Sequence, residues 1–554
     1  MAHARTSSPL VVLALLGLAI APLVACTGNL DAGPRFGGAS GDPNDPSDPS
    51  GPRDPSDPRT PAAPIPGDRT MRRITSAEYT QTVIDVLEIA PETPLPADLR
   101  TGGLSRQGAG SATSNTLAIE QYETAARDVA RRAFSEPTRA RRLLGCSPTG
   151  VADAICARSG VERLGARLFR RPLSVEESDR YTSLALDAST HTGTFDLGFA
   201  LAVSGMLQSP RFLHHVEIGE ATAEGSTRRR YTSIEMAARL ASFVWNSIPD
   251  DTLLDAAASG ALLTDDGLRL ELARMLRDPR AERAMLSFLD EHLDVDHLEG
   301  GVPDEGSTAG IATRMREELH RVLAHAIFEA PETRWRDLFD ADTTYVDAAL
   351  ADYYGLPAPG GSGYVATRVP DAQRGLLARG AVVASHGHGG NTSPTLRGLF
   401  VRTRLLCGVI APPPAGVATT IESGSGATAR ERLARHATDP TCAGCHSRMD
   451  PIGLALEQID ARGLFRTHEG TALIDTAGEL DGLPFEDAGS LGELMRDHPE
   501  TDRCLVRHLF RSAVGRRESN AEEPTFSELP SEGMSVRDML AHVITSEGFR
   551  TFEP

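Results

Sequence analysis

Three short stretches of the chain carry the signal that starts an α-helix. In Thr75–Glu78, Ser174–Glu177 and Thr232–Glu235, a hydroxyl residue stands three positions before a glutamate, which is the pattern of a capping box. Apolar residues then recur every three or four positions, as the period of an amphipathic helix requires; examples are Tyr79, Val83, Val86, Met236, Leu240 and Phe243. The sequence therefore predicts a mainly α fold.

Weaker helical patterns continue this prediction along the chain. They cover Leu268–Leu276, Glu282–Leu293, Thr313–Ala330, Val346–Tyr354, Leu505–Val514 and Ser535–Thr545. Past residue 360 the pattern is looser, and the turn-rich stretch Gly470–Phe485 is typical of a small β-hairpin or an irregular arm. We expect multi-domain helical bundles with a loop-rich C-terminal region and one small β-hairpin.

A chain of 554 residues is too long for one hydrophobic core. We expect a signal peptide and a tether followed by five folded domains. Their predicted ranges are 1–25 (lipoprotein signal peptide), 26–68 (Pro/Asp/Ser tether), 69–145, 146–225, 226–358, 359–465 and 466–554. The tether is rich in Gly, Pro, Asp and Ser, so it cannot bury enough surface to offset chain entropy.

The N-terminus has the features of an exported lipoprotein. An apolar run over Leu10–Ala21 is too short to span a bilayer but suits a signal peptide. It ends in Leu23–Cys26, which resembles a lipobox and predicts cleavage before Cys26 with lipidation of its thiol. We expect a cell-envelope lipoprotein, and Thr27 in place of aspartate favours the outer membrane. The alternative is an ordinary secretory signal with an incidental cysteine.

Charge excludes several classes of function. The formal net charge is −20, so the chain lacks the broad basic field that a general nucleic-acid partner requires. All 56 basic residues are arginine. Without lysine, Schiff-base chemistry, including that of pyridoxal phosphate, and a Walker-type phosphate loop are excluded.

The strongest chemical signal is Cys442-Ala443-Gly444-Cys445-His446. A Cys-x-x-Cys-His segment provides two thiols for the vinyl groups of haem and an adjacent imidazole for the iron, so it predicts attachment of one haem c with His446 as the axial ligand. Two alternatives remain. The cysteines form a local disulfide or redox pair, or they contribute to a zinc site, although no second Cys-x-x-Cys is present to complete it.

The second axial ligand is open. Met449 lies three residues after His446, so on one helix both face the same way and cannot bind iron from opposite sides. The other candidates are His386, His388, His436, Met495 and His498. His386 and His388 are favoured because a glycine-rich loop can approach a cofactor closely. Asp450-Pro451 has the pattern of a helix N-cap and first-turn proline, which predicts a new helix there.

Four further cysteines predict disulfides, because exported proteins fold in oxidising compartments. Cys146 and Cys156 close a short loop between two helical patterns, so we pair them; Cys407 and Cys504 then pair by elimination. The stretch Asp290–His297 has metal-ligand residue types, but its apolar spacing continues an amphipathic helix and favours a solvated face.

Several stretches together resemble a known family. They are Arg239–Asp251, Tyr345–Asp347 with Leu350–Pro357, Arg374–Leu377, Thr392–Pro394 with Arg397-Gly398, Leu406-Cys407, and Cys442–Glu457. In that order they resemble exported bacterial proteins built from consecutive domains of unknown function and grouped with planctomycete-type cytochrome c proteins. The resemblance covers roughly residues 70 to 552 and implies a helical multi-domain architecture and c-type haem at Cys442, Cys445 and His446. Asp347, and Thr395-Leu396, depart from the expected Asn and Val-Lys.

We therefore expect an envelope-tethered monohaem c-type protein that transfers electrons to a redox partner protein, with the membrane contacted through its lipid anchor. One alternative is a haem-dependent peroxidase or oxygenase with an open sixth position. Another is a non-haem binding or structural lipoprotein in which Cys442 and Cys445 form a disulfide.

Overall fold

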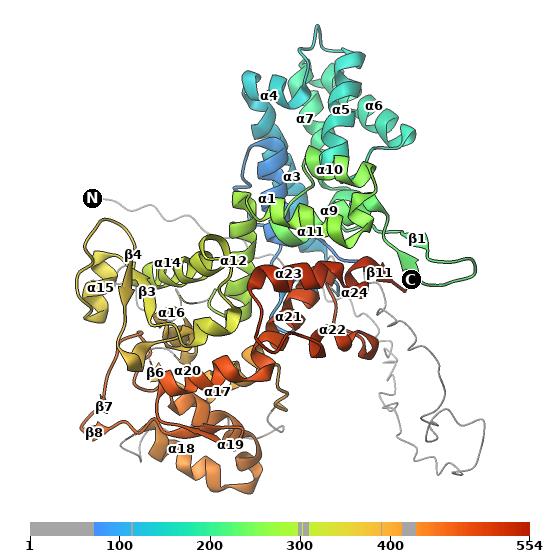
Figure 1. The fold of residues 1–554 in the computed structure, drawn as a ribbon. Coiled ribbons are helices and arrows are strands. Elements are labelled where there is room, and N and C mark those ends of the chain that lie inside the picture. The colour runs from blue at the N-terminus through green and yellow to red at the C-terminus, as the bar shows by residue number, and fades with distance from the viewer. Residues whose placement is uncertain are drawn as a thin grey trace, which may run out of the picture. The chain divides into compact units, whose positions relative to one another are not determined.

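The computed structural model describes residues 71–111, 115–296, 298, 302, 310–388, 391–412 and 428–553. The signal peptide, Cys26 and the tether lie outside the described residues, so they stay predictions. Within the described part the fold is mainly α (Figure 1). None of the described helices is both long and apolar enough to cross a membrane.

All three capping boxes start helices, as predicted. In α1 (Ser76–Leu87), α6 (Val175–Thr192) and α9 (Ser233–Trp245), the hydroxyl of the N-cap residue accepts a backbone N–H from the glutamate, and the glutamate carboxylate accepts the N–H of the cap. Two otherwise unpaired helix donors are thereby satisfied at each start.

The N-terminal helices share one hydrophobic core. α7 lies against both α3 and α6, and α5 packs on α4 and α6. Small and aliphatic residues fill most of this core, with Phe199 and Phe212 among the largest buried side chains. The other helices of this core are α3 (Thr116–Ser135), α4 (Pro137–Leu144), α5 (Ala154–Leu168), α6, α7 (Phe195–Leu207) and α8 (Pro210–Leu213). The short helix α2 (Ser105–Ala109) has no residue in this core and contacts α21 (Pro499–Val514) instead.

Most of the remaining helices build a second, continuous core, which contains both tryptophans, Trp245 and Trp335. The remaining helices are α9, α10 (Asp251–Ala258), α11 (Asp265–Met275), α12 (Pro279–Leu293), α14 (Ile311–Ala324), α15 (Ala348–Tyr354), α16 (Gly380–Ser385), α17 (Pro394–Phe400), α18 (Ala429–Thr438), α19 (Pro440–Leu454), α20 (Ala488–Asp497), α21 (Pro499–Val514), α22 (Pro524–Ser527), α23 (Val536–Thr545) and α24 (Glu547–Arg550). Of these, α18 instead packs in a small separate cluster of Ala429, Leu433 and Leu454. The domain boundaries predicted within this region stay predictions.

The strands are short and antiparallel. They are β1 (Glu220–Ala221), β2 (Arg229–Arg230), β3 (Thr343–Val346), β4 (Val365–Arg368), β5 (Gly387–His388), β6 (Asn391–Thr392), β7 (His468–Glu469), β8 (Ala472–Leu473), β9 (Gly478–Leu480), β10 (Leu483–Phe485) and β11 (Thr551–Phe552). β11 pairs with β2, with Thr551 opposite Arg230, so the end of the chain joins the sheet next to α9.

The predicted hairpin within Gly470–Phe485 is present as β9 and β10. It turns at Asp481 and Gly482, which both have positive φ, as the two central residues of a tight hairpin turn require. The helix predicted over Val346–Tyr354 begins instead at Ala348: Val346 ends strand β3, and the Asp347 side chain caps the helix.

Two disulfides tie loops to helices, and both match the expected pairing. Cys146 is bonded to Cys156 near the start of α5, and Cys407 is bonded to Cys504 on α21. The second bond joins the segment after α17 to the C-terminal helices.

Candidate functional site

Helix α19 carries Cys442, Cys445 and His446 together. Its N-cap is Asp439, whose carboxylate accepts the N–H of Thr441, and Pro440 occupies the first helical position. Residues three and four apart lie on the same side of a helix, so the two cysteines and the histidine are presented by consecutive turns. This is the layout that the haem motif requires.

The helix start predicted at Asp450-Pro451 is wrong. Pro451 lies inside α19, which has already been running for more than two turns. A proline within a helix removes one hydrogen bond to the carbonyl four residues earlier, and here the helix ends at Leu454, so only its last turn is affected. Asp450 is a contact residue within the helix rather than its cap.

The thiols of Cys442 and Cys445 are half-buried and not bonded to each other. The alternative in which they form a disulfide therefore differs from the structure. Two reduced thiols, one turn apart and partly accessible, are the form in which cysteines react with the vinyl groups of haem.

The imidazole of His446 is held by a buried carboxylate. Its Nδ1 lies 2.9 Å from Oδ2 of Asp450, whose residue is 5 % exposed. The hydroxyl of Thr395 on α17 donates to the other oxygen, Oδ1, at 2.8 Å. Because an ionised carboxylate only accepts, the imidazole proton is on Nδ1, which leaves Nε2 with the lone pair that a metal requires.

Close contact between α17 and α19 fixes this arrangement. A Cβ at Gly398 would overlap the carbonyl oxygen of Met449, and a Cβ at Gly453 would overlap that of Pro394. Only glycine allows the two backbones to approach so closely. The contact between α17 and α19 therefore requires glycine at both Gly398 and Gly453.

A buried ion pair lies at the end of the same interface. Nη1 of Arg397 donates to Oε1 of Glu457 at 2.8 Å, and both side chains are almost fully buried. Glu457 also accepts the hydroxyl of Thr392 and a guanidinium N–H of Arg466. Burial lowers the pKa of Arg397 to about 10, although Glu457 opposes this shift. Arg397 thus stays charged at neutral pH.

The candidates for the sixth ligand have other contacts. The Nδ1 of His386 donates to the carbonyl of Val382, and its ring lies 4.0 Å from that of Phe400. Its Nε2 is 3.9 Å from a carboxylate oxygen of Asp294. The side chains of His388 and His436 lie outside the described residues.

The candidate ligands downstream of the haem motif, Met495 and His498, also have other contacts in the fold. Met495 is fully buried in the main core. Nδ1 of His498 accepts the N–H of Glu500, and its Nε2 faces Asp481 at 3.1 Å. Met449 is buried on the same helix as His446. The second axial position stays a prediction.

Sequence reasoning missed the roles of Asp450 and Thr395. Thr395 is 55 residues from its partner, and no local pattern joins them. Asp450, by contrast, lies four residues after His446. If the two residues had been placed on one continuous helix, that spacing would have predicted the contact.

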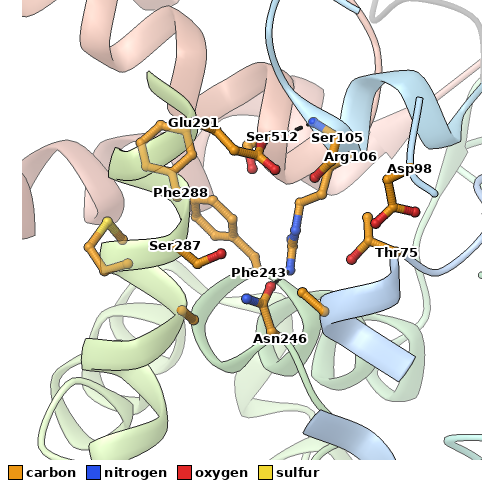
Figure 2. A pocket seen from close by; sticks show the side chains of 13 residues that line it. Thr75, Asp98, Ser105, Arg106, Phe243, Asn246, Ser287, Phe288, Glu291 and Ser512 are labelled. Carbon is orange, nitrogen blue, oxygen red and sulfur yellow. Dashed lines mark hydrogen bonds between the residues drawn. The ribbon is translucent and has the colours of Figure 1, made fainter. Parts of the chain in front are cut away.

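A separate cavity opens among α1, α2, α9, α12 and α21 (Figure 2). Figure 2 shows the Arg106 side chain extending into it toward Asn246, whose Oδ1 accepts a guanidinium N–H at 2.5 Å. Across the cavity, Glu291 accepts the N–H of Ser105 at 3.0 Å. With a volume of about 60 Å³, it is far smaller than a typical cofactor pocket of ~300–1,000 Å³ and includes no residue of the haem motif.

Comparison with protein families gives four matches in sequence order. Residues 72–135, 156–217, 231–356 and 373–469 match families that are each described as a protein of unknown function: DUF1587 (PSD3), DUF1595 (PSD5), DUF1592 (PSD4) and DUF1588 (PSCyt3), respectively. The last match, to a planctomycete cytochrome c-type family, contains α17, α19 and the whole Cys-x-x-Cys-His segment. Searches of curated proteins and of solved structures give no match.

Proposed function

Because the chain belongs to the family of multi-domain proteins of unknown function that is grouped with planctomycete-type cytochrome c proteins, we propose that it is a monohaem c-type electron carrier of the cell envelope. The arrangement on α19 supports this most directly: two unbonded thiols stand beside a histidine whose Nδ1 is held by a buried carboxylate. This donor set fits a covalently attached haem.

Each residue has a separate task. Cys442 and Cys445 would hold the haem through thioether bonds, and Nε2 of His446 would bind its iron. When bound, the haem supplies a one-electron ferric/ferrous couple. Asp450 keeps the proton on Nδ1 of His446 and fixes the plane of the ring. Thr395 holds Asp450 in place from the neighbouring helix.

The proposal places the carrier at a membrane through a lipid on Cys26. The length and composition of residues 26–68 support this, because a proline-rich chain spaces the folded part from its anchor. Cys26→Ser should move the protein from the membrane fraction to the soluble fraction. Cys146→Ser, which removes a cysteine from the folded part, should leave fractionation unchanged. Retention of Cys26→Ser in the membrane would contradict the anchor.

The test of haem attachment is direct. The exported protein, denatured and separated by electrophoresis, should stain for covalent haem and show reduced and oxidised haem c spectra. Cys445→Ser should lose covalent haem, whereas the double variant Cys146→Ala/Cys156→Ala should keep it. If the exported wild-type protein carries no covalent haem, both the carrier and any haem enzyme are excluded, and a binding or structural lipoprotein is left.

One observation favours a second candidate, a haem-dependent peroxidase or oxygenase. If His446 binds haem iron through Nε2, the carboxylate of Asp450 on Nδ1 would make it a stronger donor, which would favour the oxidative chemistry that haem supplies in such enzymes. Rapid binding of carbon monoxide to the reduced protein would indicate an open sixth position and favour this enzyme. Slow or absent binding would favour the carrier.

Met449→Ala should leave the low-spin spectrum unchanged, because Met449 lies on the helix of His446.

A further inference from the structure

A second group of metal-ligand side chains lies away from the haem motif. Cys504 and His508 stand one turn apart on α21, and Cys407 is joined to Cys504 by the disulfide. Sγ of both cysteines and a ring nitrogen of His508 all lie within 4.8 Å of one another. Cys504 and His508 are buried and Cys407 is half-buried, so this group faces solvent on one side only.

A second buried histidine contacts this group. Nδ1 of His292 on α12 lies 2.8 Å from Nδ1 of His508, although the two residues are 216 positions apart. His292 is 1 % exposed, and its other nitrogen, Nε2, has no hydrogen-bond partner among the described residues. The solvated face predicted for Asp290–His297 is therefore wrong at His292, which is buried and contacts His508 of α21.

The contact between the two imidazoles needs one shared proton. Of the two Nδ1 atoms, which lie 2.8 Å apart, one donates and the other accepts. When the proton is on His508, its Nε2 presents a lone pair toward Sγ of Cys407, 3.7 Å away.

That distance is the one a tetrahedral zinc site needs. Zinc–sulfur and zinc–nitrogen bonds of about 2.3 and 2.1 Å, at a tetrahedral angle, place S and N about 3.6 Å apart. When Nδ1 of His508 carries the proton, it donates to Nδ1 of His292, and this contact orients the ring as an acceptor beside a metal-binding histidine does.

We propose that reduction of the Cys407–Cys504 disulfide converts this group into a zinc site, with Cys407, Cys504 and Nε2 of His508 as ligands and His292 as the residue that orients His508. A water molecule takes the fourth position from the half-buried side. Two thiolates balance the charge of Zn²⁺, which suits a buried position near Arg404.

The two steps balance as follows. A tertiary phosphine and water reduce the disulfide: the sulfur–sulfur bond breaks, the phosphine is oxidised to its oxide, and the two sulfurs receive two electrons and two protons as thiols. Zinc then replaces the two thiol protons, which are released to solvent. The disulfide state offers no thiolate, so it is the form without metal.

The experiment uses the full chain carrying Cys442→Ser and Cys445→Ser, which removes haem and its thiols as competing ligands. The protein is dialysed against zinc chloride with and without the phosphine, and bound zinc is measured after removal of excess metal. The reduced chain should retain one zinc ion per chain, and the oxidised chain should retain none. Cobalt chloride should give the thiolate charge-transfer bands of a tetrahedral site in the reduced form alone.

Variants separate this site from others. Cys407→Ser should abolish zinc retention, and His292→Phe should weaken zinc binding about 10- to 100-fold, as loss of a residue that orients a metal ligand does. The double variant Cys146→Ala/Cys156→Ala removes the other disulfide and should bind zinc as the parent does. Circular dichroism confirms that each variant is folded. The proposal is overturned if the folded, reduced parent retains no zinc, or if Cys407→Ser retains it as tightly as the parent.

Discussion

Nδ1 of His446 donates a hydrogen bond to Oδ2 of Asp450, 2.9 Å away and one turn further along α19. Asp450 is buried, and Thr395 satisfies its second oxygen. A buried carboxylate with two fixed partners cannot turn away from the ring, so the imidazole plane and its tautomer are set before any metal binds.

The first prediction follows from this contact. Asp450→Asn keeps the shape of the side chain but removes its negative charge. The imidazole of His446 would then be a weaker electron donor to haem iron. Ferric iron would lose more stabilisation than ferrous iron, because it carries the higher charge. The midpoint potential of the haem should rise; a tenfold change in relative affinity corresponds to about 59 mV for one electron. Redox titration of the purified protein measures it, with covalent haem stain as the control for attachment. An unchanged potential would show that Asp450 has no influence on the iron ligand.

The second prediction concerns the contact of α17 with α19. Gly453→Ala places a methyl group against the carbonyl oxygen of Pro394, and neither backbone can move without breaking the interface. We expect a loss of about 1–3 kcal/mol in the free energy of unfolding, the usual cost of overpacking. Denaturant unfolding measures this loss.

Gly444 provides the matched control for this substitution. It lies in the same helix, but no atom lies within 4 Å of an added Cβ. Gly444→Ala should therefore be neutral or stabilise the protein by up to about 1 kcal/mol, because alanine favours helix over glycine. Equal effects of the two substitutions would refute the interface argument.

Local signals in the sequence were sufficient wherever local chemistry decides the structure. The capping box at Thr75 and Glu78 satisfies its own helix start, so four residues contain all that is needed to predict it. The short hairpin at Asp481-Gly482 is similar, because its turn depends on two residues with positive φ.

Prediction failed where two distant segments decide together. Asp439-Pro440 and Asp450-Pro451 have the same local pattern, yet only the first starts a helix. The second is part of a helix because Asp450 is held by His446 and by Thr395 from α17. The solvated face predicted at His292 is wrong for the same reason, since the burial of His292 depends on a histidine 216 residues later. No periodicity in the sequence carries that information.

The third prediction compares the two disulfides in the chain-entropy description. The Cys407–Cys504 bond closes a loop with a sequence separation of 97, and Cys146–Cys156 one of 10. These separations correspond to stabilisation of about 4.7 and about 2.7 kcal/mol, respectively. Replacing Cys407 and Cys504 by alanine should therefore lower the unfolding free energy by about 2 kcal/mol more than replacing Cys146 and Cys156. Urea unfolding without reductant or metal measures both, and a larger loss for the short loop would contradict the prediction.

The fourth prediction concerns acid stability and rests on Glu518. Burial raises the pKa of this carboxyl, but hydrogen bonds from Arg511 and Arg507 outweigh burial and lower the pKa to about 2, against 4.5 for the ordinary group. Between these two values the unfolded chain binds the proton and the folded chain does not. The contribution of Glu518 is therefore fully present above pH 4.5 and is lost as the pH falls toward 2.

Glu518→Gln tests this window. At neutral pH the variant should lose about 1–3 kcal/mol, because it leaves two guanidinium groups short of a partner. As the pH falls from 4.5 to 2, the difference between wild type and variant should shrink toward zero, since the wild-type carboxyl becomes protonated. Glu528→Gln, at an exposed position, should track the wild type throughout. If the difference between wild type and Glu518→Gln stays constant down to pH 2, the carboxylate of Glu518 does not stabilise the fold through its charge.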